Sequence, residues 1–226
     1  MTQEEYRRKF REFVLGPCRP FYEGVKPWQM GEAWHDDSLL YFEQHLPRFW
    51  RMVEMLKPVV PGLAGPFCEL GSFYPYTLYY FGRPVDLYDL VPRVCLTAMP
   101  YDVGGVRLQA FNLCTDELPR DRYAVVVMSE VLEHLPCDLL AVQRKVSAAV
   151  RPGGYLLVTY PAQYGNEAHG YDRCMGDSAV LHGGHLREFT AETVAQFFTD
   201  LRVVSTEEFT YPAYGRTFAV LYKKDR

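Results

Sequence analysis

The sequence predicts an α/β protein with a doubly wound, mostly parallel sheet, a C-terminal antiparallel hairpin and an N-terminal helical extension. Three observations support this. Residues 67–89 have the pattern of a strand, a tight turn, a helix and a second strand, which is the outline of a βαβ unit. Residues 123–128 are an unbroken apolar run rich in valine, typical of a strand buried on both faces of a parallel sheet. Two further strand patterns near the C-terminus follow each other closely enough to form a hairpin.

Length and charge limit the classes of protein and partner. The 226 residues suffice for one α/β domain with modest extensions. The net charge of -4 provides no strong basic field, so no nucleic-acid partner is expected. The charged N-terminus is unlike a signal peptide, and no apolar run approaches the roughly 20 residues of a membrane span. We therefore expect a cytoplasmic protein without a membrane partner.

The cysteines are scattered along the chain. The six positions are Cys18, Cys68, Cys95, Cys114, Cys137 and Cys174. No two have CxxC spacing, and no Cys/His cluster has zinc spacing, so no metal is expected. Cys68, Cys95 and Cys114 lie in or beside apolar runs, which predicts buried, inert thiols in a reduced protein.

Residues 1–64 are expected to form a helical extension, and residues 65–226 the α/β domain. Apolar residues recur at three- and four-residue steps over 2–15 and 38–55, which indicates two amphipathic helices. Between them, residues 18–37 are rich in aromatic residues, proline and glycine, so an ordered loop is expected there.

The remaining elements alternate along the α/β domain. After the first βαβ unit, strands are expected over 106–111, 123–128, 155–160, 202–209 and 217–223. Helices are expected over 138–150 and 191–201, with a short one after Pro92. The long, glycine-rich segment 162–188 is expected to be a loop.

Polar side chains stand at the ends of four successive strands. They are Glu69, Asp89, Asn112 and the pair Ser129-Glu130. Ligands of open parallel sheets bind beyond the carboxyl ends of the strands, so these groups are expected to converge on one crevice. Glu69 and Asp89 are about 20 residues apart, the spacing at which the second acid accepts hydrogen bonds from ribose hydroxyls. A molecule with an amino group, a ribose and an adenine would suit the set.

The turn after the first strand is poor in glycine. Gly71 lets backbone amides approach a ligand. A dinucleotide fingerprint needs three glycines, and Phe73 and Pro75 stand where the second and third would be. A ligand without a pyrophosphate therefore fits better, and nicotinamide oxidoreduction is disfavoured.

Several blocks resemble a known family. Besides Glu69-Leu70-Gly71, they are DRYAVVVMSEVLEHLP, VSAAVRPGGYLLVTYP and HLREFTAETVAQFF. Together they resemble the small-molecule branch of the class I S-adenosylmethionine (SAM)-dependent methyltransferases, whose motif I reads acid-x-Gly-x-Gly-x-Gly. The resemblance extends from about residue 67 to the C-terminus. It implies a Rossmann-like fold, with SAM as methyl donor and S-adenosylhomocysteine as product.

The resemblance also implies cofactor-binding positions. Glu69 would lie near the amino end of SAM, and Asp89 would accept hydrogen bonds from the ribose hydroxyls. Asn112, where the family usually has Asp, would bond the adenine amino group. The full implied set is Glu69, Gly71, Ser72, Asp89, Leu90, Asn112, Leu113, Ser129 and Val131.

Histidines are the candidate catalytic residues. A sulfonium methyl group is already activated, so in-line placement of the nucleophile supplies much of the effect. A base is needed when the nucleophile is a hydroxyl or an acidic carbon. His134 follows the fourth strand, while His169, His182 and His185 lie in segment 162–188, where this family often builds its acceptor site. Each also has a structural explanation: local packing for His134 and solvated loop positions for the others.

The sequence thus predicts a methyltransferase that moves a methyl group from SAM to O or N, less often C, of a small-molecule acceptor. The helical extension and segment 162–188 would close the acceptor pocket. Two alternatives stay open: an inactive SAM-fold binding or regulatory protein, suggested by Phe73 and Pro75, and a methyltransferase acting on a macromolecule. The acceptor, the methylated atom and the oligomeric state are left open.

Overall fold

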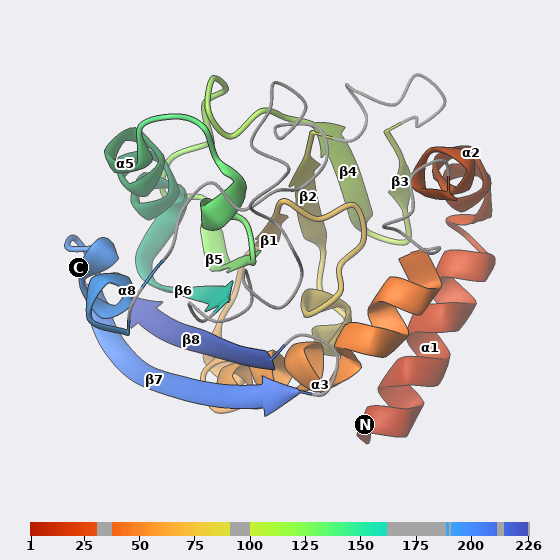
Figure 1. Ribbon diagram of the computed structural model, residues 1–226, viewed down its shortest axis with the longest axis horizontal. Helices are drawn as coiled ribbons and strands as arrows, with labels where there is room; N and C mark the ends of the chain where they lie inside the picture. The colour runs from red at the N-terminus through yellow and green to blue at the C-terminus, as the bar shows by residue number, and fades with distance from the viewer. Residues whose placement is uncertain (31–37, 91–99, 162–188, 190, 212–214, 226) are drawn as a thin grey trace. The chain divides into compact units, whose positions relative to one another are not determined.

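The computed structural model describes residues 1–30, 38–90, 100–161, 189, 191–211 and 215–225 (Figure 1). Their contacts divide the chain into two compact units. The first comprises Met1–Gly62 and Pro66–Asn112, and the second comprises Leu63–Gly65 and Leu113–Arg226. Cys95, His169, His182, His185 and the helix expected after Pro92 lie outside the described residues.

Three helices begin the first unit: α1 (Gln3–Leu15), α2 (Arg19–Met30) and α3 (Ser38–Leu56). A capping box starts α1, in which the side chains of Thr2 and Glu5 each accept a hydrogen bond from the other residue's backbone amide. Helices α1 and α3 lie side by side (Figure 1), and Glu43 of α3 accepts hydrogen bonds from Arg7 and Arg11 of α1. Both predicted amphipathic helices are confirmed. No helix in the described ranges is long and apolar enough to cross a membrane.

The loop predicted over 18–37 is wrong where α2 stands. Pro20 lies in the first turn of this helix, where an α-helix needs no amide donor. Phe21 and Tyr22 are buried on α2. Burial of these two rings favours the helix in spite of the proline and glycine that follow.

Aromatic side chains fill the core of the first unit. Phe10 of α1 is fully buried, and its ring stacks on Phe42 of α3 with centroids 4.1 Å apart. Tyr76, which follows β1, stacks on Phe49 of α3 at 4.9 Å and an interplanar angle of 6°. The Tyr6 hydroxyl of α1 donates a hydrogen bond to the Tyr76 carbonyl. The helices therefore pack directly on the segment that follows the first strand.

The strands of the first unit have the order β3-β4-β2-β1. Their bounds are β1 (Phe67–Leu70), β2 (Val85–Asp89), β3 (Asp102–Val103) and β4 (Val106–Ala110). Strand β2 is parallel to both β1 and β4, while β3, which was not predicted, is antiparallel to β4. Every residue of β1 and β2 is buried, as expected for strands covered on both faces.

The α-helix expected between β1 and β2 is wrong. The segment contains only the short 3-10 helix η2 (Leu78–Phe81), closed by Gly82 at φ +60°. Pro75 has no amide to donate, and the neighbouring Tyr74 and Tyr76 are buried. These three residues hold the backbone in a non-helical path. A second 3-10 helix, η1 (Val60–Gly62), precedes β1.

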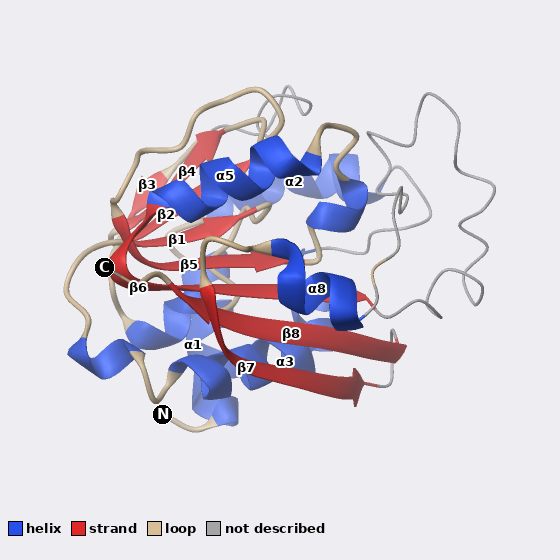
Figure 2. Cartoon of the chain, turned by 90° about the vertical axis from the view of Figure 1, so that its left-hand side faces the viewer, coloured by secondary structure: helices blue, strands red, loops and turns tan. Residues whose placement is uncertain are grey.

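The strands of the second unit have the order β5-β6-β8-β7 (Figure 2). Their bounds are β5 (Tyr123–Ser129), β6 (Val150–Pro161), β7 (Arg202–Tyr211) and β8 (Gly215–Lys223). Strand β5 is parallel to β6, and β8 is antiparallel to β6 and β7. Among the described residues of this unit, the other elements are η3 (Leu132–His134), α5 (Leu139–Ala149) and α8 (Ala191–Phe197). The predicted fold class, with parallel strands, a C-terminal hairpin and N-terminal helices, is confirmed.

Two glycines explain why β6 begins at Val150, before the predicted residue 155. Gly153 has φ +76°, a conformation that favours glycine. A Cβ on Gly154 would lie 2.9 Å from the Arg151 carbonyl oxygen and 3.0 Å from that of Tyr123. The pairing of β6 with β5 shifts register at the same place. The two glycines therefore accommodate a β-bulge, after which the parallel pairing of the two strands continues.

The prediction of an inert thiol at Cys114 is wrong, because Cys114 and Cys137 form a disulfide. Their Cα atoms are 5.6 Å apart, within the usual span of such a bridge. Cys68 is a free buried cysteine, as predicted, and so is Cys18. The expectation of a fully reduced chain is therefore wrong. Cys114 and Cys137 are 23 residues apart in sequence, and the chain forms β5 between them before the two cysteines come together.

We expect Phe10→Ala to lower the free energy of unfolding by about 3–5 kcal/mol, because it removes a fully buried stacked ring. Urea denaturation followed by circular dichroism measures this. The control is Arg8→Ala on the same helix. Arg8 is exposed and paired with Glu12, so its loss should cost less than about 1 kcal/mol. Equal effects of the two changes would contradict an aromatic core.

Candidate functional site

In the first unit, the predicted residues from three strand ends lie at one edge of the sheet. The Gly71 amide donates a hydrogen bond to the Tyr88 carbonyl at 2.8 Å, linking the ends of β1 and β2. The Phe111 amide donates to the Asp89 carbonyl, also at 2.8 Å, linking the ends of β2 and β4. Gly71, Asp89 and Asn112 are therefore brought to the same carboxyl edge, where ligands of parallel sheets bind.

Gly71 has the conformation that the predicted turn requires. Its φ is +66°, and the residue is exposed. A side chain would be strained there and would cover the backbone. The adjacent Ser72 is buried, and its hydroxyl donates a hydrogen bond to the Tyr74 carbonyl. Gly71 thus presents bare backbone, while the Ser72 side chain fixes the turn behind it.

Glu69 is buried at the end of β1 and holds this turn. Its carboxyl group accepts hydrogen bonds from the backbone amides of Thr77, at 3.2 and 3.3 Å, and of Leu78, at 3.2 Å. Burial raises the pKa of Glu69 to about 8, although the bonds from Leu78 and Thr77 act in the opposite direction. Near neutral pH burial therefore favours the protonated carboxyl group. Its bonds to the amides of Thr77 and Leu78 order the turn after β1.

Bulky residues replace the missing glycines and anchor the turn. The Phe73 carbonyl accepts a hydrogen bond from the Tyr101 hydroxyl at 2.7 Å, and the Phe73 ring lies 6.3 Å from that of Phe21 on α2. Burial raises the pKa of Tyr101 well above its usual value, so this phenol stays a hydrogen-bond donor. The Pro75 carbonyl accepts from the Tyr79 amide at 3.1 Å. Glycines at these positions would leave the backbone uncovered. Phe73 and Pro75 instead attach the turn to Tyr101, Phe21 and Tyr79.

Asp89 supplies the buried carboxylate at the end of β2, with 9% of its surface exposed. The pKa of Tyr76 is raised well above its usual value, by burial first and also by neighbouring phenols and Asp89. Asp89 therefore lies within electrostatic reach of the Tyr76 hydroxyl. Leu90 and Asn112, which follow the ends of β2 and β4, are both half-buried.

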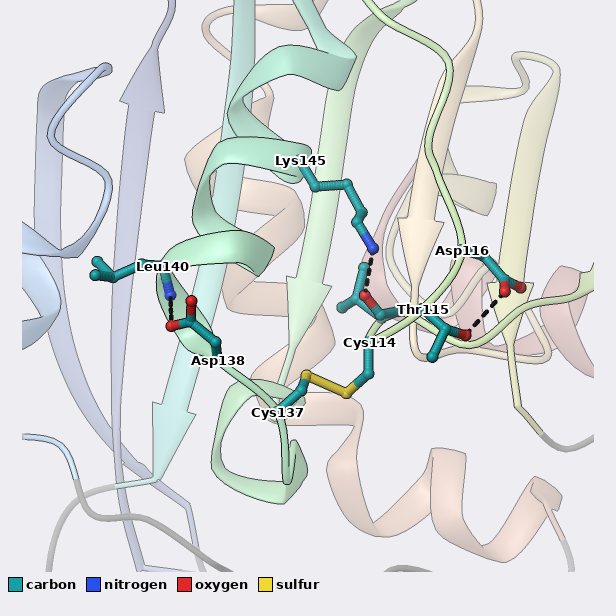
Figure 3. Close-up of a disulfide and its surroundings, with 8 residues drawn as sticks. Cys114, Thr115, Asp116, Cys137, Asp138, Leu140 and Lys145 are labelled. Carbon is teal, nitrogen blue, oxygen red and sulfur yellow. Dashed lines mark hydrogen bonds between the residues drawn. A yellow bond between two sulfur atoms is a disulfide. The ribbon is translucent and has the colours of Figure 1, made fainter.

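The second unit carries Leu113, Ser129 and Val131. Leu113 is buried, and its carbonyl accepts a hydrogen bond at 2.8 Å from Lys145, which points from α5 toward the segment that begins at Leu113 (Figure 3). The Ser129 hydroxyl lies 2.9 Å from that of Thr159 on β6. Val131 is buried just beyond the strand. Between them, Glu130 has φ +53°, a strained conformation for a residue other than glycine.

His134 ends η3 in the same unit. Its Nε2 atom is 3.6 Å from Oε1 of Glu133, a side chain with no exposed surface, while the His134 side chain is 31% exposed. A buried carboxylate beside a partly exposed imidazole is a suitable arrangement for a base. Within the described ranges, no group of three or more His, Cys, Asp or Glu residues could hold a metal ion.

The sequence prediction omits two residues of this arrangement, Tyr101 and Lys145. Tyr101 is an isolated aromatic residue before a two-residue strand, and no periodicity marks it. Lys145 precedes the buried Val146 on α5. A lysine beside a buried helical position packs its alkyl chain along the apolar face, and this pattern in the sequence could have identified it.

These features fit SAM. An exposed left-handed glycine, a buried carboxylate and a half-buried amide follow three adjacent strands of the first unit. The carboxylate can accept bonds from two ribose hydroxyls, and the amide can bond an adenine. No position at this edge provides the three-glycine bed of a pyrophosphate.

Comparison with known proteins identifies the class. Residues 68–202 match the model of the methyltransferase domain family, and the chain belongs to this family. It is a class I SAM-dependent methyltransferase, so the predicted enzyme class and cofactor are confirmed. No curated protein matches the chain.

Solved structures share the fold at low sequence identity. The N-methyltransferase NodS of Bradyrhizobium japonicum, bound to S-adenosylhomocysteine, is 16% identical with a TM-score of 0.57, covering 92% of this chain and 100% of its own. The methyltransferase in a complex with the Trm112 activator of Haloferax volcanii is 13% identical with a TM-score of 0.61, covering 82% and 94%. A SAM-dependent methyltransferase of Mesorhizobium loti is 16% identical with a TM-score of 0.56, covering 80% and 98%.

We expect Glu69→Gln to remove a pH dependence of stability. Between the ordinary pKa of 4.5 and about 8, the folded wild type binds a proton that the unfolded chain has lost. The free energy of unfolding therefore falls as pH rises through this window, by up to about 1.4 kcal/mol per pH unit. Urea denaturation at several pH values measures the slope.

The matched control is Glu54→Gln on α3, a partly exposed carboxylate paired with Arg51. This variant should keep the slope of the wild type, whereas Glu69→Gln should flatten it. If Glu69→Gln kept the wild-type slope, Glu69 would not be the titrating group.

Proposed function

We propose that this methyltransferase transfers the methyl group of SAM to an oxygen or nitrogen of a small-molecule acceptor. One observation carries the cofactor part: the buried Asp89 carboxylate lies at the same sheet edge as the exposed Gly71 backbone. The net charge of -4 supports a small acceptor over nucleic acid. The cytoplasmic location stays a prediction.

The SAM contacts in this proposal are those that the family resemblance implies, and we give them for each unit by itself. In the first, Gly71 and the turn ordered by Glu69 and Ser72 face the methionine part, Asp89 binds the ribose hydroxyls, and Leu90 and Asn112 contact the adenine. In the second, the contacts are Leu113 toward the adenine, with Ser129 and Val131 toward the methionine part. When bound, SAM supplies an electrophilic methyl group on its sulfonium.

The chain's own part in the reaction is to place the acceptor and accept its proton. His134 is our first candidate for the base, because the fully buried Glu133 carboxylate lies 3.6 Å from its Nε2 atom and can orient the ring. His169 and His185 remain candidates from segment 162–188. We keep residues 1–64 as a helical extension of the 65–226 catalytic domain, because α1 and α3 pack on the turn after β1.

A macromolecular acceptor is the second candidate. One structural neighbour is a methyltransferase in complex with the Trm112 activator, a partner named as an activator and not as an acceptor, so the labelling experiment below decides the acceptor class. NodS, an N-methyltransferase, represents transfer to nitrogen among the neighbours.

We expect Asp89→Asn to weaken SAM binding roughly tenfold to hundredfold, since a hydrogen bond to a charged group is worth about 1.5–3 kcal/mol. Isothermal titration calorimetry with SAM and S-adenosylhomocysteine measures this. The control is Asp86→Asn on the same strand. Asp86 lies three residues earlier, bonds Arg107 at 2.8 Å and points to the opposite face, so affinity should be kept. Absence of heat in the wild type would refute the site.

Label transfer from methyl-labelled SAM tests the acceptor class. Incubation with separate metabolite, tRNA and protein fractions should place the label in the metabolite fraction. Label found in tRNA or protein alone would establish the second candidate instead. Binding of SAM without transfer to any fraction would support an inactive binding or regulatory protein.

A further inference from the structure

We propose that the Cys114–Cys137 disulfide is a redox-controlled clamp on SAM binding, with the oxidised protein binding more tightly than the reduced one. The inference rests on the proposed function through Leu113, which precedes Cys114 and is assigned there to the adenine. Both cysteines and Leu113 belong to the second unit.

The position of the bridge makes it a clamp. Cys137 lies directly before Asp138, whose carboxylate caps α5 by accepting a hydrogen bond from the Leu140 amide at 2.9 Å (Figure 3). The disulfide therefore ties the segment that begins at Leu113 to the start of α5. A second tie is the Lys145 hydrogen bond to the Leu113 carbonyl, which is noncovalent and partly open to competition from water.

The closed loop contains the other proposed contacts of this unit. The two cysteines are 23 residues apart, and the whole of β5 lies between them. Ser129 ends this strand, and Val131 and His134 follow it before the chain reaches Cys137. One covalent bond thus restrains both flanks of β5. Without it, SAM binding must order these flanks and lose more conformational entropy.

The bridge is within reach of a reductant. Cys114 and Cys137 are both half-buried, whereas Cys18 and Cys68 are buried. A thiolate of a small dithiol attacks one sulfur of the pair, the S–S bond breaks, and the other cysteine leaves as a thiolate that takes up a proton. The second thiol of the reductant then closes its own disulfide and releases the first cysteine. The protein gains two electrons and two protons, and the dithiol loses them.

Thermodynamic linkage makes the proposal quantitative. If oxidation strengthens SAM binding about tenfold, SAM must favour the disulfide over the dithiol by the same factor. For a two-electron couple, a factor of ten corresponds to about 30 mV in reduction potential. Oxidation to the disulfide therefore raises the affinity for SAM, and SAM binding stabilises the disulfide against reduction by the same factor.

The test measures both sides of this linkage on the full chain. Calorimetry with S-adenosylhomocysteine compares the oxidised protein with the protein reduced by dithiothreitol, after circular dichroism has shown that the reduced form stays folded. We expect binding about tenfold weaker after reduction. Equilibration in dithiothreitol buffers with and without S-adenosylhomocysteine, read by mass spectrometry of the peptides containing Cys114 and Cys137, should show the matching shift in potential.

The control is the double variant Cys114→Ser and Cys137→Ser. It should bind like the reduced wild type and should not respond to dithiothreitol. Equal affinity of the oxidised and reduced wild type, or a potential that the ligand does not move, would overturn the clamp and leave the proposed function intact. Absence of binding in both redox states would overturn the proposed function and the clamp with it.

Discussion

The buried carboxyl group of Glu69 is the constraint on which the first unit depends. It gathers the amides of Thr77 and Leu78 and thereby fixes the path of the chain after β1. Along that path, the side chains of Tyr74 and Tyr76 are buried against the N-terminal helices, whereas Gly71 is exposed. The Gly71 amide is already bonded to the Tyr88 carbonyl, so the exposed glycine offers a ligand close approach to the backbone and no free amide donor. One buried acid therefore decides which part of the turn is structural and which part is available for binding.

The aromatic turn is a different physical solution to the task of the glycine-rich one. Glycines allow close approach because they have no side chains, but they cost conformational entropy on folding. Here Phe73 and Pro75 reduce that cost, and the rings of Phe73 and Tyr76 pack against α2 and α3. In the proposed site, a cofactor without a pyrophosphate tolerates this replacement of two glycines by Phe73 and Pro75, because the exposed Gly71 remains at the strand end.

Periodicity predicted most of the elements, and tertiary contacts decided the rest. The valine-rich run of β5 and the apolar stripes of α1 and α3 were legible because each segment buries a regular set of side chains. Helix α2 was not, because local breakers are outweighed by the burial of Phe21 and Tyr22. The disulfide forms because the chain after β5 brings Cys137 close to Cys114. Glu69 orders the turn because its carboxyl group is buried. Neither is encoded in local spacing.

The stacking of α1 and α3 on the turn after β1 also bears on how this protein can be shortened. The rings of Phe10, Phe42 and Phe49 are part of the same core as Tyr76, so they cover the turn after β1. A chain trimmed to residues 68–202, the segment that the family model matches, would expose this core to water. The N-terminal helices thus share a core with the turn after β1, although the match to the family model begins only after them.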